Sequence, residues 1–267
     1  MSVVWFNSEF LYDTLPLDPA DRGLMLGDGL FETIAVAGGQ AIWLNEHIVR
    51  LVGSAAALGI SADEADLRVS IAKVLKRSNA LHEVLRITLT RGVTQRGLAA
   101  DAHQSSLLIS LLPFDPAQQP MGLTLATSII RRNETAPSSR HKTLSYIDNV
   151  AAAREVKGKA DDALMLNTAG HVACSTVGNI FILKDGELVT PHDGQGILQG
   201  ITRAKIFDHA EFKARQDVVT VDDLYAADAV FLTNSLRLVT PVTKLDDMAL
   251  GTQSVQHIKD YLKGLSS

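Results

Sequence analysis

Cysteine is almost absent from this 267-residue sequence: Cys174 is the only one, which excludes an internal disulfide and a cysteine-rich metal site. The eight histidines show no His-x-x-x-His or similar ligand spacing, so we expect no metal. The chain also lacks any apolar run close to the roughly 20 residues that span a bilayer, and its start has no basic region followed by an apolar stretch. We therefore expect a cytoplasmic protein without a membrane partner.

A strong charge of either sign is missing as well. The formal net charge is -5, and the lysines and arginines are scattered rather than gathered into runs. Because nucleic acid is bound by extended basic surfaces, we expect no nucleic-acid partner. Hydrophobic residues make up 46% and charged residues 21% of the chain, close to the average of soluble globular proteins. Single cores stop growing at roughly 250 to 300 residues, so the length allows one or two domains, and we expect two.

The first half of the chain predicts a strand, a hairpin, two helices and two further strands, at residues 3–12, 31–44, 45–58, about 63–78, 83–90 and 106–112. The hairpin turns at the Gly38-Gly39 pair. The first helix places apolar side chains from Ile48 to Leu58 on one face, and Asn45 is its predicted N-cap.

The segment PFDPAQQP interrupts this pattern with three prolines among polar residues, which is typical of a linker. We predict a small N-terminal domain over residues 1–115, a linker over 116–120 and a larger domain over 121–267. The elements predicted in the larger domain are a strand at 123–130, a helix at about 148–157, strands at 162–167, 171–174, 178–183 and 187–190, a helix opening at Thr202, a strand at 229–233 and a helix from about Thr252.

Lys142 is the clearest candidate for a catalytic residue in the chain. It stands in RHKTLSY, flanked by Arg140 and His141, whose positive charge would lower the pKa of its amine. A lowered pKa is what a lysine that forms a Schiff base needs. An isolated lysine is far more often an ordinary surface residue, so the local sequence alone does not assign this role.

The run GHVACSTVGNIFILKDGELVTPHDGQGILQGITRAKI, residues 170–206, resembles the signature of the class IV aminotransferases. The positions that match in type and spacing are Asn179, Ile180, Phe181, Thr190, Pro191, Leu198, Gly200, Ile201 and Arg203. The resemblance extends to DRGLMLGDGLFET, NEHIVRL, TRGVTQRGL, KTLSYIDNVAAARE and TNSLRLVTPV, and so covers nearly the whole chain. It implies an α+β or α/β chain of fold type IV, with a small N-terminal α/β domain and a larger, β-rich α/β domain.

The same resemblance implies a homodimer with pyridoxal 5'-phosphate bound between the two domains and Lys142 as the residue that carries it. Arg50 matches the arginine that holds the cofactor phosphate, although a helix arginine paired with Glu46 is the simpler alternative. Ile201 and Thr202 match positions whose backbone amides meet the phosphate, and a helix N-terminus after a glycine suits that role.

Three further residues complete the cofactor set that the resemblance implies. Asn234 and Ser235 follow a strand and offer an amide and a hydroxyl to the phosphate. Tyr146, four residues after the lysine, offers a donor to the phenolic oxygen of the cofactor, or is a half-buried core tyrosine.

Cys174 is the departure from the family pattern. It occupies the position of the acidic residue that faces the pyridine nitrogen and keeps the ring protonated. A neutral thiol does not do this, and a thiolate would need a lowered pKa. An unprotonated ring would favour elimination over transamination. The alternatives are that an acid from another strand takes over, or that the enzyme is slow.

The substrate contacts are less complete matches. Arg96 and His47 correspond to positions that grip the substrate carboxylate in D-amino-acid aminotransferases, with an ordinary loop arginine as the alternative for Arg96. Phe31 stands where those enzymes carry a tyrosine. Thr33 and the TNSL segment are more similar to aminodeoxychorismate lyase.

Three functions follow from these comparisons of residues. The first is an aminotransferase that moves an amino group between a branched-chain amino acid, a D-amino acid or an amine and a 2-oxo acid acceptor. The second is aminodeoxychorismate lyase, which releases pyruvate and 4-aminobenzoate. The third is a cofactor-bound carrier or regulatory protein without catalysis, favoured by Cys174 alone.

Overall fold

The structure is a computed structural model that describes residues 3–12, 14–100, 104–209, 211–252 and 255–265. The chain divides into two compact units. The first consists of Met1–Ala117 with His141–Tyr146, and the second of Gln118–Arg140 with Ile147–Ser267. The change after Ala117 falls within the predicted linker, where Pro116–Gln118 forms a short 3-10 turn. The separate segment His141–Tyr146, which includes Lys142, was expected in the larger domain.

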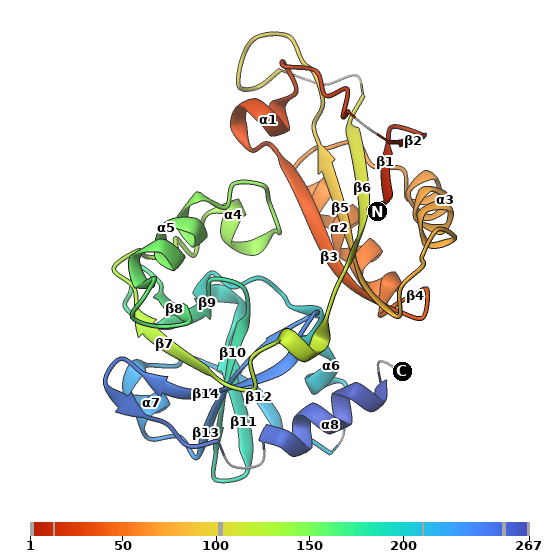
Figure 1. Cartoon of the computed structure of the whole chain (residues 1–267). Coiled ribbons are helices and arrows are strands. Elements are labelled where there is room, and N and C mark those ends of the chain that lie inside the picture. Colours follow the sequence, from red (N-terminus) through yellow and green to blue (C-terminus); the bar gives the residue numbers. More distant parts are fainter. Residues whose placement is uncertain (1–2, 13, 101–103, 210, 253–254, 266–267) are drawn as a thin grey trace. The chain divides into compact units, whose positions relative to one another are not determined.

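Among the described residues, the first unit has an antiparallel sheet of six strands in the order β2-β1-β6-β5-β3-β4 (Figure 1). These strands, β1 to β6 along the chain, span Val3–Phe6, Glu9–Leu11, Gly29–Ala37, Gln40–Ala41, His82–Thr90 and Ser106–Pro113. The helices of this unit are α1 (Arg22–Leu26), α2 (Leu44–Ala57) and α3 (Glu64–Leu75). Apolar residues of α2 and α3 bury one face of the sheet in a single core.

Helix α2 begins differently from its prediction. Its N-cap is Trp43, which has a positive φ of 52° and no capping side chain, whereas the predicted cap Asn45 lies inside the first turn. Helix α3 begins as its sequence predicts, because the Asp63 carboxylate accepts a hydrogen bond from the backbone N–H of Asp66.

The segment that carries Lys142 joins the first unit by pairing with the start of β3. The N–H of Phe31 donates to the carbonyl of Lys142 at 2.9 Å, and the N–H of Leu144 donates to the carbonyl of Gly29 at 2.8 Å. Strand β4 pairs with β3 only at Val36 and Ala37. The start of β3 can therefore pair with the segment that carries Lys142 along the same edge. Backbone pairing therefore fixes the lysine beside β3.

The second unit contains nine strands among the residues described, in the order β12-β11-β10-β13-β14-β7-β8-β9, with β15 beside β14. An additional pairing between β9 and β10 closes six of these strands into a ring. In chain order from β7 to β15 the strands are Leu123–Thr127, Asp162–Leu166, Val172–Ser175, Asn179–Lys184, Glu187–Pro191, Ala214–Asp217, Ala229–Asn234, Leu238–Leu245 and Met248–Ala249.

Five α-helices accompany these strands within the described part of the chain. They are α4 (Pro137–Arg140), α5 (Ile147–Val156), α6 (Ile201–Phe207), α7 (Val221–Tyr225) and α8 (Val255–Leu265). The sequence did not predict α1, α4, α7, β12, β14 or β15. No helix in the described ranges has both the length and the apolar character needed to cross a membrane.

Candidate active site

Strand β3 presents two different faces, and this alternation organises the first unit's part of the site. Residues directly opposite each other in an antiparallel pair lie on one face, and successive residues alternate. Thr33 is opposite Arg86, and Phe31 is opposite Thr88, so these four share one face of the sheet. Glu32 lies on the other face, which packs against α2.

Glu32 is a buried carboxylate held by two residues of α2. It is 1% exposed and accepts hydrogen bonds from Nε of Arg50 at 2.8 Å, from Nη2 of Arg50 at 2.6 Å and from Nδ1 of His47 at 2.7 Å. Burial raises the pKa of Glu32, but the charge of Arg50 and these hydrogen bonds outweigh it and lower the pKa to about 2. Glu32 is therefore an anion at neutral pH.

The environment of His47 keeps its imidazole neutral. Burial lowers its pKa, Glu32 opposes this, and the charges of Arg50 and Lys142 lower it further. Since Nδ1–H donates to Glu32, Nε2 is left as an acceptor, and this buried atom has no hydrogen-bond partner among the described residues. His47 thus has no charge with which to hold a substrate carboxylate.

Lys142 lies on the face of the sheet that carries Phe31. Its Nζ is 4.3 Å from the centroid of the Phe31 ring and 5.6 Å from that of the Tyr146 ring, and these two rings meet edge to face. Burial lowers the pKa of Lys142 to about 8, Glu32 opposes the shift, and Arg50 and Arg86 add to it. The lowered pKa agrees with the sequence prediction, but the charges responsible are not those of the neighbours expected from the sequence.

Arg86 is a cation that no acid among the described residues neutralises. Its guanidinium lies 4.0 Å from the centroid of the Phe31 ring, and it has no hydrogen bond or ion pair within the described residues. Burial lowers its pKa, and only Tyr146 opposes this. Partial burial of a guanidinium without an anion destabilises the folded protein, and its five N–H donors suit a carboxylate.

In the second unit, Cys174 lies in an apolar cluster beside its strand partner Met165. Burial raises the pKa of the Cys174 thiol, the charge of Arg132 opposes this, and Asp162 adds to it. The thiol is consequently neutral at physiological pH. Arg132 is itself buried, with Nη1 donating to Asn149 at 3.1 Å and Nη2 donating to the carbonyl of Ser139 at 3.1 Å.

The N-terminus of α6 offers donors without partners. Gly200 is its N-cap, so the first backbone N–H groups have no intrahelical acceptor. The hydroxyl of Thr202 is buried and has no hydrogen-bond partner among the described residues. Asn179 fixes the backbone just before this helix, since its side-chain amide donates to the carbonyl of Leu198 at 2.8 Å. A Cβ on Gly200 would lie 2.0 Å from Oδ1 of Asn179, so only glycine fits there.

Asn179 also connects this helix to Cys174. It pairs with Cys174 on one side and with Thr233 on the other, so the three residues form a row across β9, β10 and β13. The hydroxyl of Thr233 is a second buried group without a partner within the described ranges.

Asn234 has a mainly structural part in this region. Its Oδ1 accepts from the backbone N–H groups of Leu236 at 3.1 Å and Arg237 at 2.9 Å, which shapes the turn after β13. Its amide is thereby committed to the backbone. Ser235 is half-buried in the same turn, and its side chain has no hydrogen bond among the residues described.

Within the first unit, the structure places four of the predicted residues on one face of β3, His47 and Arg50 on α2 beside Glu32, and Arg96 apart from both groups. Phe31, Thr33, Lys142 and Tyr146 lie around the same face of β3, whereas Arg96 is exposed in the loop after β5. The expected carboxylate pair of Arg96 and His47 is not assembled. Within the second unit, the predicted residues Cys174, Ile201, Thr202, Asn234 and Ser235 lie at the ends of β9, α6 and β13.

Sequence analysis did not single out four residues that stand out in the structure: Glu32, Arg86, Arg132 and Asn149. Asn179 was matched to the signature but was given no role. A signal existed for Glu32, because the strand GLFETIAVA alternates and puts this charge among its core-facing residues. For Arg86 the alternation of EVLRITLT indicated only the face of the strand.

Comparison with known proteins identifies the family. The family of amino-transferase class IV matches residues 29–245, and the chain belongs to it. The chain is 31% identical over 269 residues to a putative branched-chain-amino-acid aminotransferase of Methanocaldococcus jannaschii, covering 97% of this chain and 93% of that protein. It is 27% identical to the aminodeoxychorismate lyase of Bacillus subtilis, covering 94% of this chain and 89% of that enzyme.

A solved structure shows the same fold. The crystal structure of a putative 4-amino-4-deoxychorismate lyase of Legionella pneumophila superposes with a TM-score of 0.88 at 30% identity, covering 95% of this chain and 96% of that one. The fold type IV architecture predicted from the resemblance is thus confirmed.

Proposed function

We propose that this protein is a pyridoxal-phosphate-dependent aminotransferase that moves an amino group from an amino acid to a 2-oxo acid, with Lys142 as the attachment point of the cofactor. The observation that carries the proposal is the setting of Lys142, whose Nζ lies against Phe31 and Tyr146 with a pKa of about 8. At pH 7 about one such amine in ten is neutral, a far larger share than for an ordinary lysine. A neutral amine is required to form a Schiff base.

The residues present fit the cofactor. At the start of α6, the buried hydroxyl of Thr202 has no partner within the described ranges, and the first backbone N–H groups have no intrahelical acceptor. A phosphate supplies acceptors for such donors. We propose that Ile201, Thr202 and Ser235 bind the phosphate, together with Arg50, whose guanidinium plane is fixed by Glu32.

When bound, pyridoxal phosphate supplies an electron sink for the negative charge that develops on the substrate α-carbon. The chain's own groups would move the proton. Nζ of Lys142, with its pKa of about 8, accepts a proton near neutral pH and returns it. Tyr146 is proposed to donate from its hydroxyl to the phenolic oxygen of the cofactor.

We propose Arg86 as the residue that recognises the substrate carboxylate. Its guanidinium shares the Phe31 ring with Lys142, at 4.0 Å and 4.3 Å from the ring centroid. It therefore lies near the amine while retaining its full hydrogen-bonding capacity. This role replaces the one predicted for His47, which is neutral and bonded to Glu32.

Aminodeoxychorismate lyase is the second candidate, and Cys174 is the observation that favours it. Its thiol is neutral and buried, so it offers the pyridine nitrogen only a weak hydrogen bond. A ring that is not kept protonated is a weaker electron sink, which favours elimination. The family and the placement of Lys142 serve both reactions.

One experiment separates the candidates. The purified protein, loaded with pyridoxal phosphate, is mixed in turn with L- and D-amino acids, amines and aminodeoxychorismate. Conversion of the cofactor to its amine form, seen in the absorption spectrum, indicates transamination. Release of pyruvate without that conversion indicates the lyase. If none of these compounds changes the absorption spectrum or releases pyruvate, the third function, a carrier or regulator, is indicated and the proposal is overturned.

We also propose that the protein is a homodimer. Leu24, Met25 and Leu26 are consecutive exposed apolar residues of α1, between 50% and 65% exposed, and such clusters are usually covered by a partner. Light scattering coupled to size-exclusion chromatography tests this, with a monomeric mass as the opposing result. Matched charged substitutions at Met25 and at the separate exposed Met121 distinguish this surface from others.

A further inference from the structure

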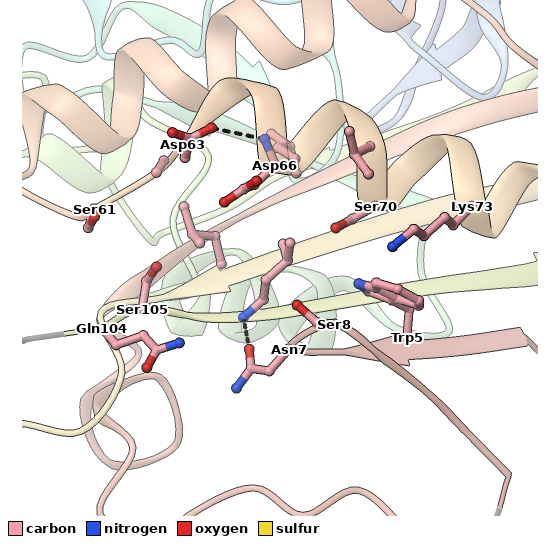
Figure 2. A pocket seen from close by; sticks show the side chains of 15 residues that line it. Trp5, Asn7, Ser8, Ser61, Asp63, Asp66, Ser70, Lys73, Gln104 and Ser105 are labelled. Atoms are coloured by element: carbon pink, nitrogen blue, oxygen red, sulfur yellow. Dashed lines mark hydrogen bonds between the residues drawn. The ribbon is translucent and has the colours of Figure 1, made fainter.

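A pocket of about 350 Å³ lies within the first unit, and neither Lys142 nor any residue of β3 lines it. One wall is α3, the opposite wall is β1 with the turn that follows it, and the ends of β5 and β6 close the base (Figure 2). Its lining includes three leucines, which are Leu67 on α3, Leu89 on β5 and Leu107 on β6. The pocket is therefore lined mainly by polar side chains with a smaller apolar part, a composition that suits a small ligand with charged groups.

One end of the pocket carries hydrogen-bond donors, and one of them is buried without an acceptor in the part of the chain that the structure describes. Trp5 is 3% exposed, and its indole N–H is buried without a partner among the described residues. Lys73 has its ammonium group 5.0 Å from the centroid of the Trp5 ring and forms no ion pair with any residue that the structure describes. Figure 2 shows the Lys73 nitrogen, the Ser70 hydroxyl and the indole nitrogen turned toward the same part of the pocket. Leaving a buried N–H without an acceptor is unfavourable, so an acceptor is expected at this end.

The other end of the pocket is acidic. Asp63 already accepts the N–H of Asp66 as the cap of α3, so the carboxylate of Asp66 is the group available to a ligand. Figure 2 shows this carboxylate facing the pocket. Asp66 and Lys73 are seven residues apart and so lie on the same side of α3, about 10 Å from each other along its axis.

We propose that this pocket binds a small ω-amino acid, with its carboxylate on Lys73, Ser70 and the indole N–H of Trp5, its apolar chain on the three leucines, and its ammonium group on Asp66. The spacing carries the choice of ligand. In an α-amino acid the two charged groups are bonded to one carbon and do not reach both ends. A compound with several methylene groups between them does.

The proposal is tested by titrating the holoprotein with 6-aminohexanoate in a calorimeter, with hexanoate and hexylamine as probes that lack one charged end. One 6-aminohexanoate per chain should bind, and each of the other two should bind on the order of tenfold more weakly. Equal affinity for hexanoate would remove Asp66 from the site and overturn the ligand class. No saturable binding of 6-aminohexanoate would overturn the site itself.

Variants assign the binding to this pocket. Lys73→Gln and Asp66→Asn change exposed groups and should each weaken binding about tenfold, whereas Lys76→Gln, at the end of the same helix, should leave it unchanged. Trp5→Phe keeps the buried ring and removes only the N–H, and should weaken binding too. The Lys142→Ala variant should bind the probe like the parent, which separates this pocket from the cofactor lysine. Binding that is lost in Lys142→Ala, or that persists fully in Lys73→Gln and Asp66→Asn, contradicts the proposal.

Discussion

Glu32 and Arg50 are joined by two hydrogen bonds, which run from Nε and Nη2 of the arginine at 2.8 Å and 2.6 Å. The carboxylate thereby fixes the plane of the guanidinium. We expect Glu32→Gln to weaken pyridoxal-phosphate binding at least tenfold, since an amide accepts only through its oxygen and its NH₂ opposes the arginine. Absorbance titration of the apoprotein measures this. Arg50→Ala should lose at least as much, and unchanged affinity in both variants would separate Arg50 from the phosphate.

The same pair predicts a loss of stability in acid. The pKa of Glu32 is about 2 in the folded protein against an ordinary value of 4.5, so its contribution is fully present above pH 4.5 and disappears as the pH falls toward 2. At about 1.4 kcal/mol per unit this contribution is on the order of 3 kcal/mol. The free energy of unfolding in urea should therefore fall less steeply between pH 4.5 and 2.5 in Glu32→Gln than in the parent. Glu9→Gln, at an exposed site, is the control. Its free energy of unfolding should fall with pH as steeply as that of the parent.

Lys142 predicts the pH dependence of cofactor attachment. Because its pKa of about 8 lies below the ordinary 10.5, the neutral amine appears as the pH rises through 8. The rate at which the apoprotein forms a borohydride-reducible link should rise with a midpoint near 8. Arg86→Gln removes a charge that lowers this pKa and should move the midpoint upward. A midpoint above 10 in the parent, or a reducible link that survives Lys142→Ala, would defeat the assignment.

Arg86 should act on substrates that carry a carboxylate. We expect Arg86→Gln to raise KM for the amino acid and the 2-oxo acid by on the order of tenfold or more, because a charge-assisted contact is lost. An amine substrate without a carboxylate should be affected much less. Arg96→Gln provides the comparison, since Arg96 is exposed in its loop. If Arg96→Gln shows the larger loss for carboxylates, the two roles must be exchanged.

Cys174 tests the choice between transamination and elimination. Cys174→Glu should shift the absorption of the bound cofactor and raise transamination relative to pyruvate release, since a carboxylate beside the pyridine nitrogen keeps it protonated. The charge of Arg132 at this position favours the ionised glutamate. The larger side chain costs about 1 to 3 kcal/mol of stability in a packed cluster. Cys174→Ser keeps a neutral group and should leave the product ratio nearly unchanged. An unaltered spectrum and ratio in a folded glutamate variant would mean that another acid addresses the ring.

The sequence predicted those features of the site that depend on local patterns. Lys142, Arg50 and the start of α6 stand in short motifs that resemble the family signature, so the sequence alone could single them out as candidates. Glu32 and Arg86 could not be predicted in the same way, because their surroundings arise from the pairing of β3 with β5, two strands far apart in the sequence. Trp43, the N-cap of α2, has a left-handed backbone conformation and is not a residue type that favours caps, whereas Asn45 is. N-cap preference therefore predicts the wrong residue here.

The attachment of Lys142 to β3 was also beyond sequence reasoning. The segment His141–Tyr146 is too short to show a period, and its backbone bonds to Gly29 and Phe31 connect residues more than 100 positions apart. Contacts of this kind depend on the whole fold, whereas the strands and helices around them could be predicted from the alternation of apolar residues.

That attachment limits how this protein can be recombined with its relatives. The chain passes from one compact unit to the other after Ala117, after Arg140 and again after Tyr146. A chimera with one crossover at the proline-rich segment would take Glu32 and Arg50 from one parent but Lys142 from the other. The lysine and the strand that seats it would then have separate ancestries. A hybrid that exchanges the first unit intact requires three crossovers, so the two parts of this enzyme are inherited less independently than their separate cores suggest.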